Sequence, residues 1–251
     1  WWALGYGLAI AGLLASTFHL GNPQRALLAF SQWRSSWLSR EAWASVAALV
    51  VLAPMALSDW LGLGLPRAIG QLGAVLALVT VFTTSMIYTQ IKAVPRWHHW
   101  ITPVMFLTFA VTGGAILAGQ GTASLFCALL LGVLLVMWSL GDGQFARAAQ
   151  SLGTATGLDR IGAVTVFEQA HTAGNYLLRE MIFVVGRKHA VKLRGLALVL
   201  ACIVPVLAMI VLPKTAGFVI AAVSYFIGAF AARWLFFAEA EHVVGLYYGK
   251  R

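Results

Sequence analysis

The sequence predicts an all-α, polytopic bundle of transmembrane helices, and three observations support this fold class. First, 61% of the 251 residues are hydrophobic and only 10% are charged, whereas a soluble domain carries about 25% charged residues. Second, the hydrophobic residues form seven runs of about 19 to 24 residues, each long enough to cross a hydrocarbon core of about 30 Å as a helix. Third, nearly all Lys and Arg residues lie in alternate gaps between these runs. Backbone groups in lipid must bond within their own segment, so helices are expected rather than strands.

The first three spans have polar residues at their ends. All seven spans, in chain order, are expected at Trp1–Leu20, Ala42–Leu63, Ala68–Gln90, Ile101–Gly119, Thr122–Leu140, Gly195–Leu212 and Thr215–Ala238. The first opens on Trp1 with neither a Met nor a polar lead-in, so we expect a further segment upstream. It ends at His19, and the second begins beside Glu41 and contains Pro54, which predicts a kink. The third ends near Tyr88.

The last four spans carry signals of helix packing. Ala115 and Gly119 in the fourth span, and Gly228 and Ala232 in the seventh, are small residues four apart. Such pairs let two helices approach closely in a membrane. Pro205 lies inside the sixth span and predicts a second kink.

The distribution of positive charge predicts the orientation of the bundle. On one side lie 14 of the 17 Lys and Arg residues: Arg25, Arg34, Arg40, Lys92, Arg96, Arg147, Arg160, Arg179, Arg187, Lys188, Lys192, Arg194, Lys250 and Arg251. The other side has only Arg67 and Lys214, and Arg233 falls within the last span. Because loops rich in Lys and Arg stay in the cytoplasm, the first group is expected to be cytoplasmic.

The long gap from Gly141 to Arg194 is predicted to be a cytoplasmic loop with an interfacial amphipathic segment. Residues 175–191 mix apolar and charged character in a way that suits a helix lying in the headgroup plane. This strip, which includes Arg187 and Lys188, can lie on anionic lipid headgroups. It can also be a docking platform for a soluble subunit, and both interpretations stay open. We treat residues 1–251 as one integral-membrane domain.

Two ionisable residues mark a candidate site at the cytoplasmic edge. His19 ends the first span and Glu41 begins the second, so both lie on the same side of the membrane. An imidazole changes charge near neutral pH, and a carboxylate can pass a proton onward. These groups suit a quinone, which needs a hydrogen bond to a ring oxygen and proton exchange with each electron pair. The simpler alternative is a capped helix end with an ion pair between Glu41 and Arg40, and residue types alone favour it.

Further polar and aromatic residues gather on the same side. Tyr88 ends the third span, and Trp97, His98, His99 and Trp100 precede the fourth. The two Trp residues are interpreted as belt aromatics at the membrane interface. The two His residues are interpreted as hydrated interface residues.

The positions of His and Cys argue against metal cofactors in this chain. A haem in a helical bundle takes its axial His from inside the spans, but none of the six His residues lies in the middle of a span. Only two Cys residues exist, Cys127 and Cys202, and they are far apart in the sequence. We therefore expect neither a haem nor an iron–sulfur cluster here.

Several runs of residues resemble the membrane anchor subunits of the dimethyl sulfoxide reductase family. These runs are His19–Ala26, Ser36–Glu41, Tyr88 with Val94–Trp97, and Trp100–Pro103. The similarity extends from Trp1 to about Leu140, and the last two spans agree in pattern. Within that family, the segments His171–Met181 and Gly186–Ala190 resemble the anchors of quinone-linked cytoplasmic sulfite dehydrogenases.

The resemblance implies an anchor of eight helices without haem, so one helix is expected before Trp1. It also implies that the chain binds ubiquinone or menaquinone in a bacterial inner membrane. Electrons would be exchanged with an iron–sulfur subunit that holds [4Fe–4S] clusters, and through it with a molybdopterin catalytic subunit. Sulfite oxidation coupled to quinone reduction is the expected reaction. The charge distribution predicts a cytoplasmic molybdenum subunit, and this position suits a sulfite dehydrogenase better than it suits an exported reductase.

The resemblance assigns roles to individual residues. His19 and Glu41 match the histidine and glutamate of the family's quinone site, and Tyr88 is a second candidate to carry the proton. The expected quinone-binding residues are His19, Ser39, Arg40, Glu41 and Tyr88. The expected partner-docking residues are Arg25, Arg34, Arg96, Arg187 and Lys188. No residue is expected to bind a metal or to act on the substrate of the catalytic subunit.

Three alternatives remain. The first is the anchor of an S- or N-oxide reductase, in which electrons flow from menaquinol in the opposite direction. The second is a passive anchor without a redox role. The third is a small-solute transporter, for which Thr83, Thr84 and Ser85 would be the polar groups near the membrane midplane.

Overall fold

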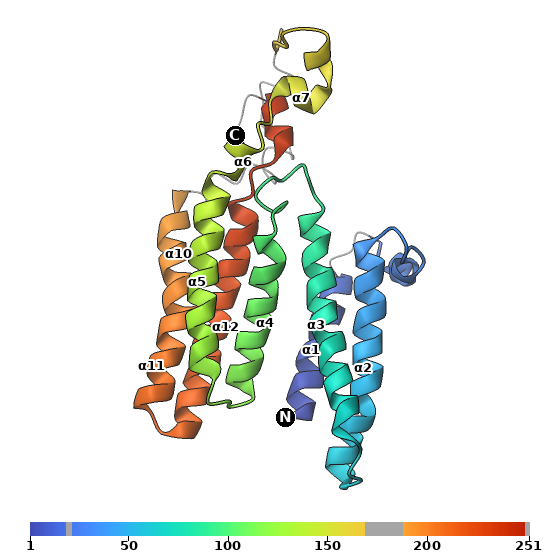
Figure 1. Cartoon of the computed structure of the whole chain (residues 1–251), viewed down its shortest axis with the longest axis vertical. Helices are drawn as coiled ribbons and strands as arrows, with labels where there is room; N and C mark the ends of the chain where they lie inside the picture. Colours follow the sequence, from blue (N-terminus) through green and yellow to red (C-terminus); the bar gives the residue numbers. More distant parts are fainter. Residues whose placement is uncertain (19–21, 169–187, 249–251) are drawn as a thin grey trace. The chain divides into compact units, whose positions relative to one another are not determined.

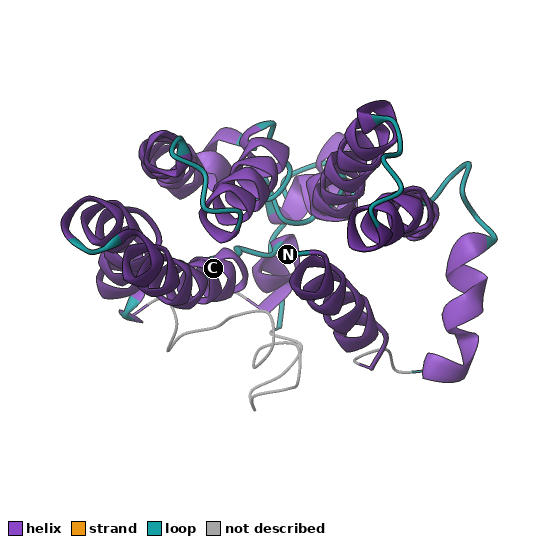
Figure 2. Ribbon diagram, turned by 90° about the horizontal axis from the view of Figure 1, so that it is seen from below, coloured by secondary structure: helices purple, strands orange, loops and turns teal. Residues whose placement is uncertain are grey.

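The computed structural model describes residues 1–18, 22–168 and 188–248. None of these residues is in a strand, and long helices dominate (Figures 1 and 2). The chain divides into two compact units, Trp1–Ile87 and Tyr88–Arg251. The predicted all-helical fold class is confirmed.

The first unit consists of three long helices and one short segment. They are α1 (Trp2–Phe18), the 3₁₀ segment η1 (Pro23–Phe30), α2 (Trp37–Leu61) and α3 (Arg67–Thr89). The last turn of α3 passes the boundary between the units. The short links make consecutive helices antiparallel, so the start of α2 and the end of α3 lie at the same end of the unit (Figure 1).

The second unit packs four long helical segments and several short ones. The long elements are α4 (Ile101–Leu117), α5 (Ala123–Asp142), α10 (Ala190–Leu198) continued by η3 (Val199–Ile203) and α11 (Val204–Val211), and α12 (Lys214–Ala238). The short ones are α6 (Gln144–Arg147), α7 (Leu152–Thr156), η2 (Leu158–Arg160) and η4 (Val243–Tyr248). Their core includes Ile116, Leu130, Leu134 and Leu235, all essentially inaccessible to solvent.

Each predicted span corresponds to a helix in the structure. Among the described residues, five helices are long and apolar enough to cross a membrane, and α1 and α4 are shorter apolar helices. The predicted starts differ from the observed ones at α2, which begins at Trp37 rather than Ala42, and at α10, which begins at Ala190 rather than Gly195. Half of the added residues are polar, namely Ser39, Arg40, Glu41, Lys192 and Arg194, and polar side chains are tolerated where a helix leaves the hydrocarbon and meets water.

The sixth predicted span contains a turn of π-helix. This turn, η3, directly precedes Pro205, which lies in the first turn of α11. A proline lacks the N–H that would close an α-helical bond, and its ring crowds the carbonyl of Ala201 four residues earlier. Widening the preceding turn relieves this crowding, so the helix is irregular next to Pro205, while the predicted kinks at Pro54 and Pro205 stay predictions.

The two predicted small-residue pairs behave differently. A Cβ atom on Gly228 would lie 2.3 Å from the backbone nitrogen of Ala201, so α12 rests directly on η3 there. By contrast, Gly119 has a φ of +64° and no atom within 4 Å of where its Cβ would be. Gly119 therefore serves the turn after α4, and the predicted role of that residue in helix packing was wrong.

Candidate functional site

Glu41 lies in the second turn of α2, where its carboxylate reaches the neighbouring helix α3. The hydroxyl of Thr84 donates to Glu41 Oε1 at 2.7 Å and also lies 2.8 Å from the carbonyl of Thr80. The Glu41 side chain is half-buried. A carboxylate at a helix boundary with such a partner has a fixed position. Glu41 is the carboxylate among the predicted quinone-binding residues, and its role in proton exchange stays a prediction.

The predicted partner of Glu41 cannot be placed. His19 belongs to residues 19–21, which lie outside the described part of the chain. The expected meeting of the imidazole with the carboxylate therefore stays a prediction. The segment that follows these three residues is described, and it constrains the surroundings of Glu41.

Ser39 secures that segment to the start of α2. Its side chain is 2% exposed, its hydroxyl donates to the carbonyl of Ala29, and its oxygen accepts from the backbone N–H of Gln32 at 3.2 Å. Trp43 adds a bond from its indole nitrogen to the carbonyl of Phe30 at 3.0 Å. The Ser39 hydroxyl is thus bonded to two backbone groups of the preceding segment. This geometry favours a structural role for Ser39 over contact with a ligand.

Arg40 is also directed towards this segment. Its Nε donates to the carbonyl of Trp33 at 3.1 Å, and its Nη2 donates to the carbonyl of Arg34 at 2.8 Å. The guanidinium stacks over the ring of Trp37 at 4.2 Å from the centroid. These contacts complete the turn before α2, so Arg40 orders the loop that borders Glu41.

Tyr88 lies in an aromatic cluster of the second unit. Its hydroxyl accepts a bond from Nη2 of Arg233 at 2.7 Å. Its ring meets those of Trp97 and Phe236 edge-on, at centroid distances of 5.5 and 5.3 Å. The sequence placed Arg233 within the last span without giving it a role, although an ionised residue there is a recognised sign of function.

Four charged residues from distant parts of the sequence form an ion-pair network in the second unit. Arg96 bonds Asp142 at 3.0 Å and Glu239 at 2.8 Å, and Arg194 bonds the same two carboxylates. Glu239 is 5% exposed and Arg96 is 9% exposed. The network joins the loop before α4 to the ends of α5, α10 and α12. Arg96, expected to dock a partner, is thus engaged within its own chain, and the geometry favours a structural role.

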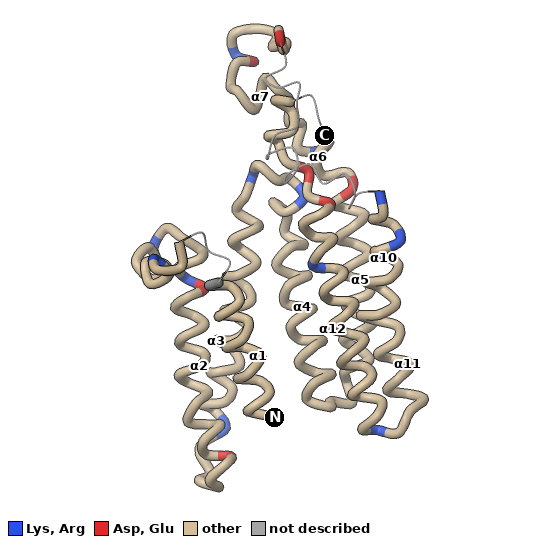
Figure 3. Tube along the Cα trace, turned by 180° about the vertical axis from the view of Figure 1, so that it is seen from behind, with Lys and Arg blue, Asp and Glu red and all other residues tan. Residues whose placement is uncertain are grey.

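The other expected docking residues that are described lie on the surface. Arg25 in η1, Arg34 after it and Lys188 are exposed, while Arg187 lies outside the described residues. Figure 3 shows most Lys and Arg positions of the backbone gathered at one end of each unit. Arg67 and Lys214 are exceptions, because they begin α3 and α12 at the other end of each unit. The asymmetry found in the sequence is therefore also an asymmetry in space within each unit.

Trp97 differs from its interpretation as a belt aromatic. Its side chain is 7% exposed, stacks on Phe236 at 5.2 Å and donates to the carbonyl of Phe236 at 2.8 Å. That interpretation was wrong, because an indole N–H with a partner inside the bundle can be buried at little cost. Trp100 is 62% exposed, as expected of an interface residue.

His99 is held as a neutral imidazole at the start of α4. Its Nδ1 accepts from the backbone N–H of Ile101 at 3.3 Å. Burial, followed by the charges of Arg147 and His98, lowers the pKa of this imidazole. In the described part of the chain, no group of three or more His, Cys, Asp or Glu side chains lies close enough to hold a metal ion.

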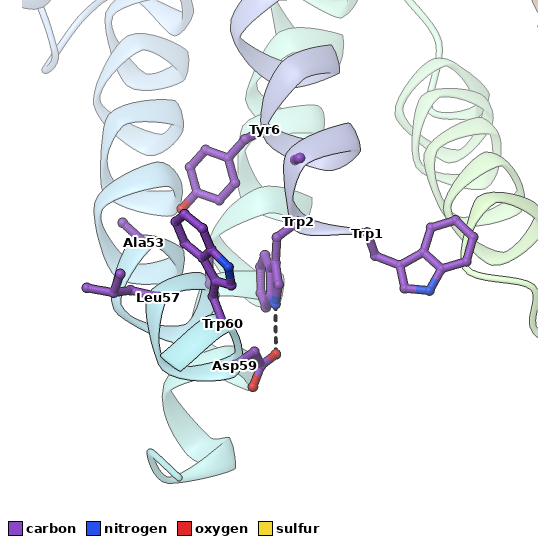
Figure 4. Close-up of a pocket in the computed structure, with 9 residues that line it drawn as sticks. Trp1, Trp2, Tyr6, Ala53, Leu57, Asp59 and Trp60 are labelled. Atoms are coloured by element: carbon purple, nitrogen blue, oxygen red, sulfur yellow. Dashed lines mark hydrogen bonds between the residues drawn. The ribbon is translucent and has the colours of Figure 1, made fainter. Parts of the chain in front are cut away.

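The first unit also has an aromatic cavity that the sequence did not suggest. It measures about 620 Å³ and lies between the start of α1 and the end of α2 (Figure 4). Its lining is Trp1, Trp2, Ala3, Tyr6, Ala53, Ala56, Leu57, Asp59 and Trp60. Trp2 Nε1 donates to Asp59 Oδ2 at 2.7 Å. Asp59 follows Glu41 by 18 residues in α2, roughly 27 Å along the helix, so this cavity is separate from the site around Glu41.

The fold and these charged ends define the class first: a multi-pass helical membrane protein with polar groups concentrated at one end of each unit. Residues 4–249 match the family described as DMSO reductase anchor subunit (DmsC), and the chain belongs to this family. It is also 32% identical over 272 residues to a sulfite dehydrogenase subunit from Allochromatium vinosum, in an alignment that covers 96% of this chain and 82% of that protein. No solved structure matches the chain. The family resemblance found in the sequence is confirmed.

Proposed function

We propose that this chain is the quinone-binding membrane anchor of a molybdopterin and iron–sulfur oxidoreductase. In this role it passes electrons between an iron–sulfur subunit and the quinone pool of a bacterial inner membrane. Membership of the anchor family supports the anchoring role. The observation that carries the quinone site is the half-buried Glu41 carboxylate, fixed by the Thr84 hydroxyl at 2.7 Å near the end of a membrane helix.

The residues around Glu41 fit a quinone headgroup. When bound, a quinone supplies chemistry that takes up or releases two electrons and two protons. Glu41 exchanges the proton with water at the membrane edge, and His19 donates a hydrogen bond to a ring oxygen. Tyr88 offers a further donor, its phenol O–H. Ser39 and Arg40 hold the loop bordering Glu41, which limits where a headgroup can enter.

The charge distribution supports a cytoplasmic position for this end of the protein. The ends rich in Lys and Arg face the cytoplasm under the positive-inside rule, so Glu41 and its loop do too. The iron–sulfur subunit then docks on the same side, where Arg25, Arg34, Arg187 and Lys188 supply positive charge. The loop 141–194 adds a further docking or headgroup-binding surface. We infer seven spans in residues 1–251, within one membrane domain.

The substrate of the complex is inferred from the relatives. The similar protein of Allochromatium vinosum is named as part of a sulfite dehydrogenase, so we infer sulfite oxidation on the molybdopterin subunit. The family description favours the second candidate, an anchor of a dimethyl sulfoxide reductase that oxidises menaquinol.

The transporter alternative gains no support from α3. The hydroxyl of Thr83 bonds the carbonyls of Val79 and Thr80, and that of Ser85 bonds the carbonyl of Phe82. These groups satisfy their own helix, and a substrate site would need them to face a cavity instead.

The test is Glu41→Gln in the complete membrane complex. Quinone-linked turnover is measured relative to dye-linked turnover of the same sample, because the dye takes electrons from the soluble subunits. We expect this ratio to fall at least about tenfold, since proton exchange by a positioned side chain is worth roughly 100-fold or more. Glu168→Gln, which changes an exposed carboxylate, is the matched control and should keep the ratio. An unchanged ratio in Glu41→Gln contradicts the proposed site.

A further inference from the structure

Arg233 is an ionised side chain inside the last membrane helix, five residues before the end of α12. A charge at such a position costs free energy, so it has a partner or a function. Its guanidinium lies over four aromatic rings, those of Tyr88 and Phe106 at 4.7 Å, Phe237 at 4.8 Å and Phe236 at 5.2 Å. Cation–π contacts of this kind stabilise a positive charge away from water.

The hydrogen bond between Arg233 and Tyr88 has only one possible direction. A guanidinium has donors and no acceptor, so Nη2 of Arg233 donates and the phenolic oxygen of Tyr88 accepts, at 2.7 Å. The O–H of Tyr88 is therefore free to donate elsewhere. Among the residues that the structure describes, no acceptor bonds this hydrogen. A half-buried phenol is thus left with one unused donor.

The surrounding rings prevent Tyr88 from turning away. Trp97, Phe106, Phe236 and Phe237 all contact its ring, at centroid distances between 5.3 and 5.8 Å. Trp97 is itself fixed by stacking on Phe236 and by its bond to the backbone. The phenol ring and its oxygen therefore have one position. The hydrogen bond from Arg233 occupies one lone pair of that oxygen and so limits the directions in which the O–H can point.

We propose that Arg233 is a positioning residue that prepares Tyr88 for contact with a quinone headgroup. By donating to the Tyr88 oxygen, it orients the phenol O–H towards an external acceptor, a carbonyl oxygen of the quinone headgroup. This inference rests on the proposed function and extends it to a residue of α12. Tyr88 makes the contact with the quinone, and Arg233 acts through Tyr88.

A double-mutant cycle in the complete complex tests this coupling. Tyr88→Phe, Arg233→Gln and the double variant are compared for the quinone KM and kcat, each relative to dye-linked turnover. Because each single change removes the same hydrogen-bonded unit, each should lower quinone kcat/KM by about tenfold. The double variant should lose no more than either single one. Arg233→Lys retains a donor and should recover most of the loss, while Lys214→Gln is the control for an exposed charge.

Additive losses, about a hundredfold in the double variant, would show that Arg233 acts apart from Tyr88 and would overturn the inference. A quinone kcat/KM unaffected by Arg233→Gln would also overturn it. If Arg233→Gln does not assemble, Tyr88→Phe decides: an unchanged quinone kcat/KM in that variant overturns the inference, because Arg233 is proposed to act only through Tyr88. The Glu41→Gln variant separates the two claims, because its failure to impair quinone turnover contradicts the proposed site while leaving the coupling of Arg233 and Tyr88 measurable.

Discussion

The buried carboxylate of Glu239 shows how individual residues stabilise the second unit. It accepts from Arg96 at 2.8 Å and from Arg194 at 2.6 Å, and its side chain is 5% exposed. Asp142 bonds the same two guanidinium groups, but its side chain is 51% exposed. Water screens an exposed pair and does not screen a buried one. The two carboxylates therefore form similar bonds, but the bonds of Glu239 contribute more to the free energy of unfolding than those of Asp142.

We predict that Glu239→Gln destabilises the protein much more than Asp142→Asn does. Removing the buried charge leaves two guanidinium groups poorly compensated, which costs about 3 to 5 kcal/mol, whereas the exposed pair is worth about 1 kcal/mol or less. Thermal unfolding of the purified protein in detergent measures both. Equal losses of stability would show that burial does not govern this network.

The network also shows that residue types in a sequence do not reveal which side chains bond each other in the fold. Arg96 was identified as a charged residue next to a membrane span, and docking was a reasonable expectation. The bonded pairs of the network are separated by 45 to 143 positions in the sequence, so no local pattern connects them. Ser39 is similar, because a serine in a motif does not reveal that its hydroxyl bonds Ala29 and Gln32.

At the scale of single elements, the contact between α12 and η3 depends on the absence of a side chain. A Cβ on Gly228 would lie 2.3 Å from the backbone nitrogen of Ala201 and 2.8 Å from its Cα. Backbone atoms cannot rotate away as a flexible side chain can, so any larger residue must separate the two helices. Pro205 creates the widened turn that α12 meets here.

Gly228→Ala is therefore expected to destabilise the protein by about 1 to 3 kcal/mol, the usual cost of forcing extra volume into a packed core. Gly114→Ala is the matched control. Gly114 is exposed in α4, and a Cβ added to it would meet no atom within 4 Å, while alanine is the better helix former by up to about 1 kcal/mol. Opposite signs in thermal unfolding are expected. A neutral Gly228→Ala would contradict the close contact.

Apolar run length predicted every long helix, because lipid demands about 20 apolar residues in each span. The same signal failed at the polar starts of α2 and α10. There the helices include charged residues such as Arg40 and Glu41, which lower the mean hydropathy although the backbone is helical. The π turn in the sixth span was predictable only as a distortion at Pro205, since its form depends on packing against α12.

For the whole molecule, the sequence predicted the charge asymmetry and the family, and the structure and comparisons support both. It also predicted the pair His19 and Glu41 from one motif, and the structure describes Glu41 with its partner Thr84. The cavity near Trp60 and the role of Arg233 could not be predicted, because they depend on side chains from different helices meeting. The function of the whole molecule depends on whether a quinone binds near Glu41 or in the cavity near Trp60.

Photolabelling of the complete complex with a photoreactive quinone analogue, followed by mapping of the modified peptides, is the most direct test of the quinone site. The proposed function predicts adducts on the peptides that carry His19 and Glu41, suppressed by excess unlabelled quinone and reduced in Glu41→Gln. Competed adducts confined to the cavity of Trp2 and Trp60, or no competed adduct on this chain, would contradict it.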